Sequence, residues 1–175
     1  MTTADATHEP VNTKDALRRE DLRFRTLDEL KQDLARIEQA ESIGVLRATG
    51  NWTPGEVCDH LATFWKYSLD GFPPEMKPPL ILKLAAKALF KKKAAAGEPP
   101  TAGLKFPKKI APMLEPTAGV AFDEGLARLR ACIERTEAGA PFTDKSPMFG
   151  EFTHQEWINL NLGHCALHLS FLRPE

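Results

Sequence analysis

Long apolar runs are missing from the sequence, and their absence argues against a chain that spans a membrane. The most apolar stretch, L-I-L-K-L-A-A-K-A-L-F at residues 80–90, is short and interrupted by lysines. A helix that crosses a bilayer needs about 20 apolar residues in a row. The first residues, M-T-T-A-D-A-T-H-E-P-V-N-T-K, also lack the apolar segment of a secretory signal peptide. We therefore expect no membrane span and a cytoplasmic protein.

An excess of one charge sign and a disulfide framework are missing too. The 23 lysines and arginines nearly balance the 24 aspartates and glutamates, so the net charge indicates no nucleic acid partner. The three cysteines, Cys58, Cys132 and Cys165, are an odd number without C-x-x-C spacing, which favours a reducing compartment. Phosphate-binding glycine patterns and G-x-S-x-G are absent. These absences leave an ordinary globular protein without a nucleotide site.

What the sequence does contain is helical periodicity. The chain is long enough for one domain with a core of its own, and we expect a flexible N-terminal arm at residues 1–20 and a single helical domain at 21–175. Thr26, Thr53 and Thr153 each have glutamate three residues later, the spacing of a capping box at a helix start. Apolar residues at helical spacing follow each threonine. The predicted long helices cover residues 26–40, 53–70, 120–138 and 153–172.

Strand alternation is not convincing anywhere in the sequence, so the predicted fold is an all-α bundle. Residues 73–116 are the least regular part and read as an insertion between the second and third long helices. They contain a predicted lysine-rich helix at 80–96, followed by an extended loop at 101–116. This segment could be a solvated lid whose lysine stems cover apolar surface, a gate over a pocket, or a contact for membrane headgroups or nucleic acid.

The last predicted helix carries the strongest chemical signal. His164 and His168 are four residues apart in G-H-C-A-L-H-L, so both rings project from one largely apolar face. Burying two imidazoles is costly unless their nitrogens are engaged, and a divalent metal engages them. His60, on the apolar side of the second predicted helix, could reach the same interior space. Three histidines leave positions open for water or substrate, as catalytic sites do. The alternative is that these are core histidines satisfied by hydrogen bonds.

Three segments resemble a known superfamily. G-N-W-T-P-G-E-V-C-D-H-L-A, S-P-M-F-G-E-F-T-H-Q-E-W and G-H-C-A-L-H-L are similar to those of the DinB/YfiT-like superfamily of metalloenzymes, and most of all to an uncharacterised domain-of-unknown-function branch. The resemblance implies an up-down-down-up four-helix bundle in which His60, His164 and His168 bind a divalent metal ion, nickel or zinc. It also implies a small-molecule substrate, thiol transfer with a low-molecular-weight thiol or thiol-dependent isomerisation, and a homodimer. Leu167 and Ser146 stand where this branch is expected to have histidine.

Other polar residues near the histidines have two interpretations each. Glu56, one turn before His60, could be a general base, but its capping role is favoured. Asn161 could orient water or substrate, or simply form an interhelical hydrogen bond. Asp59 is expected to point to solvent, and His154 to be exposed or to cap its helix. Cys165 is rotated by about 100° from His164, so we do not expect it to bind the metal.

The sequence thus leaves two main functions open. One is a metal-dependent transferase or hydrolase in which the cation lowers the pKa of a water or thiol toward neutrality. The other is a non-catalytic bundle that binds a ligand or partner, with the metal structural or absent.

Overall fold

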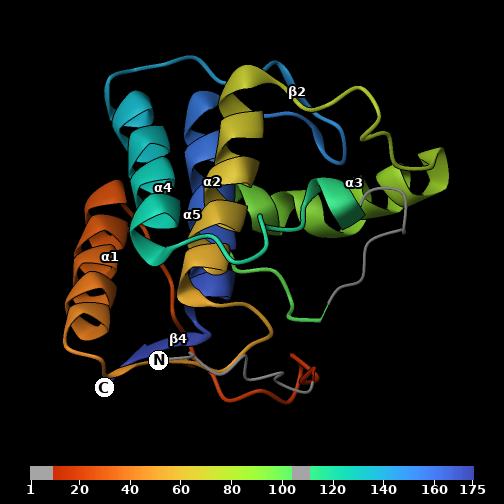
Figure 1. Cartoon of the computed structure of the whole chain (residues 1–175). Helices are drawn as coiled ribbons and strands as arrows, with labels where there is room; N and C mark the ends of the chain where they lie inside the picture. Colours follow the sequence, from red (N-terminus) through yellow and green to blue (C-terminus); the bar gives the residue numbers. More distant parts are fainter. Residues whose placement is uncertain (1–9, 104–110) are drawn as a thin grey trace.

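The computed structural model describes residues 10–103 and 111–175. The described chain is mostly helical, as predicted. Its helices are α1 (Leu27–Ser42), α2 (Pro54–Asp70), α3 (Leu80–Ala95), α4 (Phe122–Glu137) and α5 (His154–Leu169), and a short 3₁₀ turn covers Ala111–Met113. In Figure 1, α1, α2, α4 and α5 stand side by side, and α3 runs crosswise from the side of α2 and α5, away from α1 and α4. By the colour gradient, α1 and α5 run in one direction and α2 and α4 in the other.

Strands are present, so the prediction of a chain without strands is wrong. β1 (Leu46–Ala48) pairs antiparallel with β4 (Leu172–Pro174), and β2 (Lys145–Ser146) pairs antiparallel with β3 (Gly150–Glu151). Two or three residues are too few to show the period-two alternation on which strand prediction depends. The start of β4 also explains why α5 ends at Leu169 rather than at residue 172, as expected.

Threonine caps begin three of the helices, as their spacing predicts. Thr53 and Thr153 form complete capping boxes, in which each side chain accepts a backbone N–H three residues on and the glutamate there accepts the threonine N–H. Thr26 is only half of such a box, because Glu29 accepts the N–H of Arg25 instead. The caps fix where α2 and α5 start and therefore which helical faces their histidines occupy.

The hydrophobic core lies between α1, α2, α4 and α5. Its largest fully buried side chains on these helices include Leu34, Leu61, Trp65, Leu129 and Leu162. Each such side chain contributes roughly 1.5–3 kcal/mol of burial free energy.

Two glycines let α4 approach α2 more closely than side chains would allow. A Cβ atom on Gly125 would lie 2.4 Å from the Gly55 carbonyl oxygen, and one on Gly55 would lie 2.2 Å from the Val120 oxygen. The segment that enters α4 is therefore held directly against the first turns of α2, one turn from His60.

The N-terminal arm predicted at residues 1–20 falls partly outside the described residues. The described part contacts the helices: the Arg19 guanidinium donates to both carboxylate oxygens of Asp33 at 2.6 and 2.8 Å and to the Leu169 carbonyl at 2.9 Å. The Arg19 N–H also donates to the Ser170 carbonyl. This arginine joins the start of the chain to α1 and to the end of α5.

The predicted lysine-rich helix is α3. The extended loop expected after it lies partly in residues 104–110, outside the described part of the chain. None of the described helices is both long and apolar enough to cross a bilayer.

Candidate metal centre

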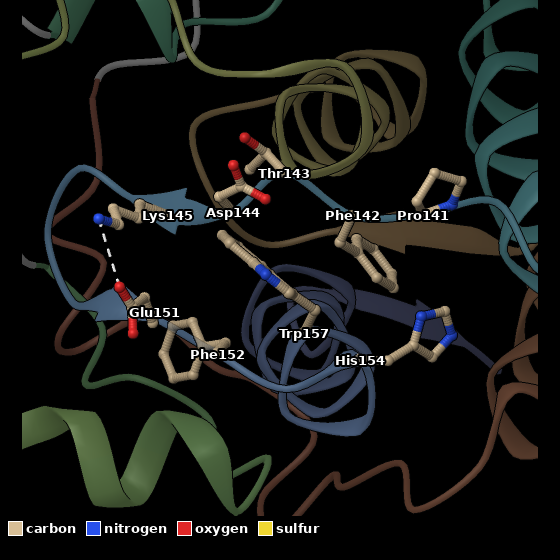
Figure 2. A pocket seen from close by; sticks show the side chains of 9 residues that line it. All are labelled: Pro141, Phe142, Thr143, Asp144, Lys145, Glu151, Phe152, His154 and Trp157. Atoms are coloured by element: carbon tan, nitrogen blue, oxygen red, sulfur yellow. Dashed lines mark ion pairs between the residues drawn. The ribbon is translucent and has the colours of Figure 1, made fainter.

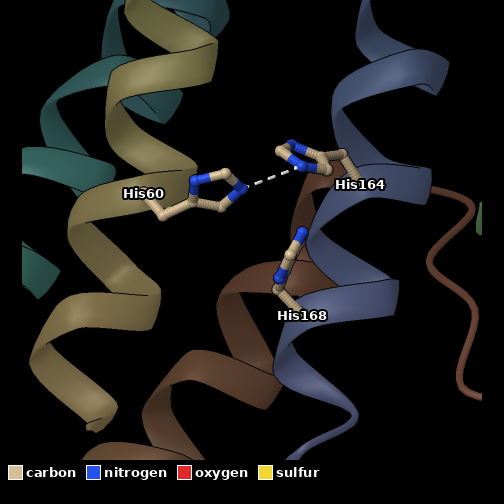
Figure 3. Close-up of side chains that lie close together, drawn as sticks. All are labelled: His60, His164 and His168. Carbon is tan, nitrogen blue, oxygen red and sulfur yellow. Dashed lines mark hydrogen bonds between the residues drawn. The ribbon is translucent and has the colours of Figure 1, made fainter. Parts of the chain in front are cut away.

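Three histidines from two helices converge on one point. His60 projects from α2, and His164 and His168 project from successive turns of α5, as Figure 3 shows. One ring nitrogen from each lies within 4.8 Å of the other two. The Nε2 atoms of His60 and His164 are 3.1 Å apart. The group that the spacing selected is therefore assembled in the fold and could hold a metal ion.

The orientation of the His60 ring is set by its other nitrogen. Nδ1–H donates to the carbonyl oxygen of Leu114, which lies in the loop between the 3₁₀ turn and α4. A ring that carries its proton on Nδ1 keeps a lone pair on Nε2. This is the arrangement that metal-binding histidines have, where a carbonyl or carboxylate holds the second nitrogen and fixes the tautomer.

The loop whose Leu114 carbonyl accepts the hydrogen bond from His60 is bonded to α2 at two further points. Asp59 accepts the Thr117 N–H at 2.8 Å and is paired with Arg128 of α4, and one oxygen of Glu56 accepts the Gly119 N–H at 3.0 Å. Burial raises the pKa of Asp59, but the bonds from Thr117 and Arg128 outweigh it and leave that pKa below its usual value. These contacts hold the Leu114 carbonyl within hydrogen-bonding distance of His60 Nδ1.

The expectation that Asp59 points to solvent is wrong, since the residue is only 3% exposed. It does point away from the histidine cluster, as its place on α2 requires. Glu56 makes the contacts of its capping role: its second oxygen accepts the Thr53 N–H at 2.9 Å. Both oxygens of this general-base candidate are thus occupied by backbone N–H groups.

The three imidazoles are held in the neutral form. Burial lowers the pKa of His60 to about 4, although the Leu114 carbonyl and Asp59 act in the opposite direction. Burial also lowers the pKa of His164 and of His168 well below the ordinary value, and the neighbouring histidines lower both further. Neutral imidazole is the form that binds metals, so the donor set is ready at neutral pH.

The spacing of the nitrogens fits a divalent ion. Zinc–nitrogen bonds are about 2.0–2.1 Å long, so two nitrogens on one ion are about 2.8–3.4 Å apart as the angle between the bonds goes from octahedral to tetrahedral. The 3.1 Å between His60 and His164 lies in that range. Imidazole suits zinc, copper, iron and nickel, so the donor set fits a divalent transition metal without selecting one of them.

The cluster forms one wall of a cavity of about 360 Å³. Most of the other lining side chains are apolar: Val57, Phe64, Ala102, Leu167 and Phe171 are among them. The Trp52 ring stacks on His168 with centroids 5.4 Å apart and lies 4.7 Å from the His60 ring. Glu115 is the one carboxylate among the described lining residues. The cavity thus suits a small and largely apolar molecule.

The remaining candidates lie outside this cavity. Asn161 is buried between α5 and α2, where its amide donates to the Trp157 carbonyl and its oxygen is 3.5 Å from the Ser68 hydroxyl. Cys165 is buried in the hydrophobic core. These positions favour the interhelical interpretation of Asn161 and agree with the exclusion of Cys165 as a ligand.

His154 lines a different hollow. This hollow, of about 560 Å³, is shown in Figure 2 with Phe142, Phe152 and Trp157 around it and the Lys145–Glu151 ion pair at its edge. Its Asp144, Glu151 and His154 side chains do not converge on one point as the three histidines do. His154 itself is exposed, as expected.

The two departures from the branch pattern have different consequences. Leu167 lines the cavity, so leucine there makes its wall more apolar than histidine would. Ser146 is buried in the β2–β3 turn, where its hydroxyl accepts the N–H groups of Met148 and Phe149, and it lies outside the cavity. Neither departure removes a member of the histidine group.

Three residues of the site were not predicted from the sequence: Trp52, Leu114 and Glu115. Leu114 acts through its carbonyl, for which any residue type would serve, and Glu115 lies in an irregular loop. Trp52 immediately precedes the Thr53 cap, a position where an apolar side chain often packs against the first turn of the helix, and this position is the signal that could have indicated it.

Comparison with known proteins gives one family. A family model described as "Protein of unknown function (DUF1569)" matches residues 16–175. No curated protein and no solved structure matches the chain.

Proposed function

The chain belongs to the DUF1569 family of proteins of unknown function, so we propose its function from the histidine site. We propose that the protein binds a divalent metal ion, nickel or zinc, with His60, His164 and His168, and that it acts on a small molecule. The proposed reaction is a transfer or a hydrolysis. Thiol transfer with a low-molecular-weight thiol comes first, because the chain resembles the DinB/YfiT-like superfamily, in which that activity occurs. The observation that carries the proposal is the convergence of three neutral imidazoles on the end of an apolar cavity.

When bound, the ion would act as a Lewis acid that lowers the pKa of a water or thiol in its open positions. The protein supplies the surroundings. The Leu114 carbonyl keeps the His60 tautomer, and the loop contacts of Asp59 and Glu56 keep that carbonyl in place. Trp52 covers the His168 ring, and the apolar walls exclude water from the substrate.

Proton transfer would then fall to Glu115 rather than to Glu56 or Asn161. Glu115 lines the cavity and is exposed, whereas both oxygens of Glu56 accept backbone N–H groups. Asn161 is bonded within the helix pair. We assign Glu56 and Asn161 positioning tasks and Glu115 the exchange of a proton with substrate.

We further infer that α1, α2, α4 and α5 form the up-down-down-up bundle of the superfamily, in one domain over residues 21–175, with α3 as an insertion. Their shared core and their directions in Figure 1 support this. Three free cysteines favour a reducing, cytoplasmic location. Homodimer formation is inferred from the resemblance alone.

The test is metal content by elemental analysis, on protein purified without a nickel-affinity step. We expect about one nickel or zinc ion per chain in the wild type and none in His164→Ala. His154→Ala is the matched control, since it removes an exposed histidine from the same helix and should leave the metal in place. Loss from both variants would mean that the metal is not held at this cluster.

A protein without metal, whose thermal unfolding does not change when zinc or nickel is added, would refute the proposal. The histidines would then be packing residues, and a non-catalytic bundle that binds a ligand or partner would be the better description. A metal-loaded wild type would justify assays that combine thiols with small electrophiles, with Glu115→Gln as the variant expected to bind metal normally and react more slowly.

A further inference from the structure

Helix α3 exposes an unusual amount of apolar surface. Ile81 is 84% exposed, Leu80 69% and Leu89 66%, while Ala86 is the one buried residue of the helix. Large apolar side chains that are exposed singly need no explanation, but a contiguous group marks an interaction site. Leu80, Ile81 and Leu84, which is 58% exposed, lie at neighbouring positions in the first turns of α3, and these turns project beyond the other helices in Figure 1.

The same helix carries a concentrated positive charge. It contains five lysines and no acidic residue, Lys83, Lys87, Lys91, Lys92 and Lys93. The whole chain has a net charge of −1, so the charge of α3 is segregated from an otherwise acidic molecule. Whatever covers α3 must accept apolar side chains and cations together.

Helical geometry places these two kinds of residue side by side. At 100° per residue, Leu80, Leu84 and Ala88 fall within about 80° of one another, with Ile81 about 20° beyond Ala88. Lys83 and Lys87 fall along one edge of this arc, and Lys91 falls inside it, where its ammonium donates to the Glu151 carbonyl. Leu82 and Leu89 lie on the opposite side of the helix. Exposed apolar side chains in the first turns, with two lysines beside them, suit the headgroup–acyl boundary of a membrane, because long lysine stems let the charge reach the headgroups.

The C-terminal end of α3 is fixed to the rest of the molecule. The Asn159 amide of α5 donates to the Ala95 carbonyl at 2.8 Å, Lys91 donates to the Glu151 carbonyl at 2.6 Å, and Arg23 donates to the Ala96 carbonyl at 2.9 Å. None of the residues of α3 lines the histidine cavity. The helix is thus presented outward at a set angle, and the lining residues do not favour a gate over the cavity.

We propose that α3 docks the protein on an anionic lipid surface, with Leu80, Ile81 and Leu84 entering the headgroup–acyl boundary and the lysines contacting acidic headgroups. The phosphates of a nucleic acid would pair with the lysines, but a nucleic acid would leave the leucines and the isoleucine without an apolar environment. A second copy packed α3 against α3 would bring ten lysines together, because a two-fold interface repeats every residue. An acidic bilayer accepts both groups.

The test is co-sedimentation of the full chain with vesicles of phosphatidylcholine alone or with phosphatidylglycerol added. We expect binding to the anionic vesicles only, and its loss as salt is raised. Lys83→Gln with Lys87→Gln should weaken partitioning about 30-fold, at roughly 1 kcal/mol per lysine. Ile81→Asp with Leu84→Asp should weaken it at least about 100-fold, because two side chains lose their apolar burial.

Ile43→Asp is the matched control, since Ile43 is 66% exposed on a different surface; it should bind as the wild type does. Absence of wild-type binding at low salt, equal binding to both vesicle types, or no effect of the α3 substitutions would overturn the proposal. So would binding to duplex DNA without binding to vesicles. A lipid-free dimer that Ile81→Asp with Leu84→Asp dissociates would assign the face to a second copy instead.

Discussion

The three clustered histidines should make the metal-free protein sensitive to mild acid. His60 has a pKa of about 4 in the folded protein against 6.5 for an unperturbed ring. Between these values the unfolded state binds more protons, so stability falls as the pH is lowered through this window. At pH 5 the difference contributes about 2 kcal/mol of destabilisation from His60 alone, or about 1.4 kcal/mol for each pH unit below 6.5. His164 and His168 act in the same direction, because their pKa values are also lowered.

The measurement is urea unfolding followed by circular dichroism at pH 7 and pH 5, with a chelator present. The free energy of unfolding of the wild type should fall by about 2 kcal/mol more than that of His60→Gln, in which this ring cannot gain a proton. His154→Gln, with its exposed ring, should behave as the wild type. Equal losses in the wild type and in His60→Gln would refute the claim that folding keeps His60 neutral.

Two further substitutions test how the site is supported. Asp59→Ala should lower the free energy of unfolding by about 2 kcal/mol and weaken zinc binding in a titration, because Arg128 and the Thr117 N–H lose a buried acceptor. The control Asp123→Ala, at an exposed position, should lower the free energy of unfolding by less than about 1 kcal/mol. Equal losses in the two variants would argue against a positioning role for Asp59. Gly125→Ala should lower the melting temperature, because its Cβ would lie 2.4 Å from the Gly55 carbonyl oxygen. We expect the free energy of unfolding to fall by about 2 kcal/mol, although alanine has the better helix propensity. An unchanged melting temperature would mean that α2 and α4 are farther apart than the structure shows.

Local signals predicted the helices well. The bounds of α2 follow from Thr53 and Pro54 at its start and Gly71 at its end, and these signals need no distant partner. The convergence of His60, His164 and His168 was also predictable. The three rings lie on the apolar faces of two helices, and those faces pack against each other in the core.

Contacts between distant segments could not be predicted in the same way. The partner of Asp59 is Arg128, 69 residues away, and a position on a helix does not reveal such a partner. The Leu114 carbonyl is equally hidden, since every residue has one. The β1–β4 pair joins Leu46 to Pro174, and neither segment is long enough to show a strand pattern alone.

The place of the N-terminal segment has a consequence for how the protein is produced. Arg19 fastens this segment beside the end of α5, and Thr13 lines the histidine cavity. The 12 residues before Thr13 can span at most about 40 Å when extended, so a polyhistidine tag fused ahead of Met1 begins within reach of the cavity. Such a tag could place an extra imidazole on the metal, hold an ion in His164→Ala, and block the position that substrate needs. Removing the tag by cleavage keeps metal analysis and activity assays interpretable.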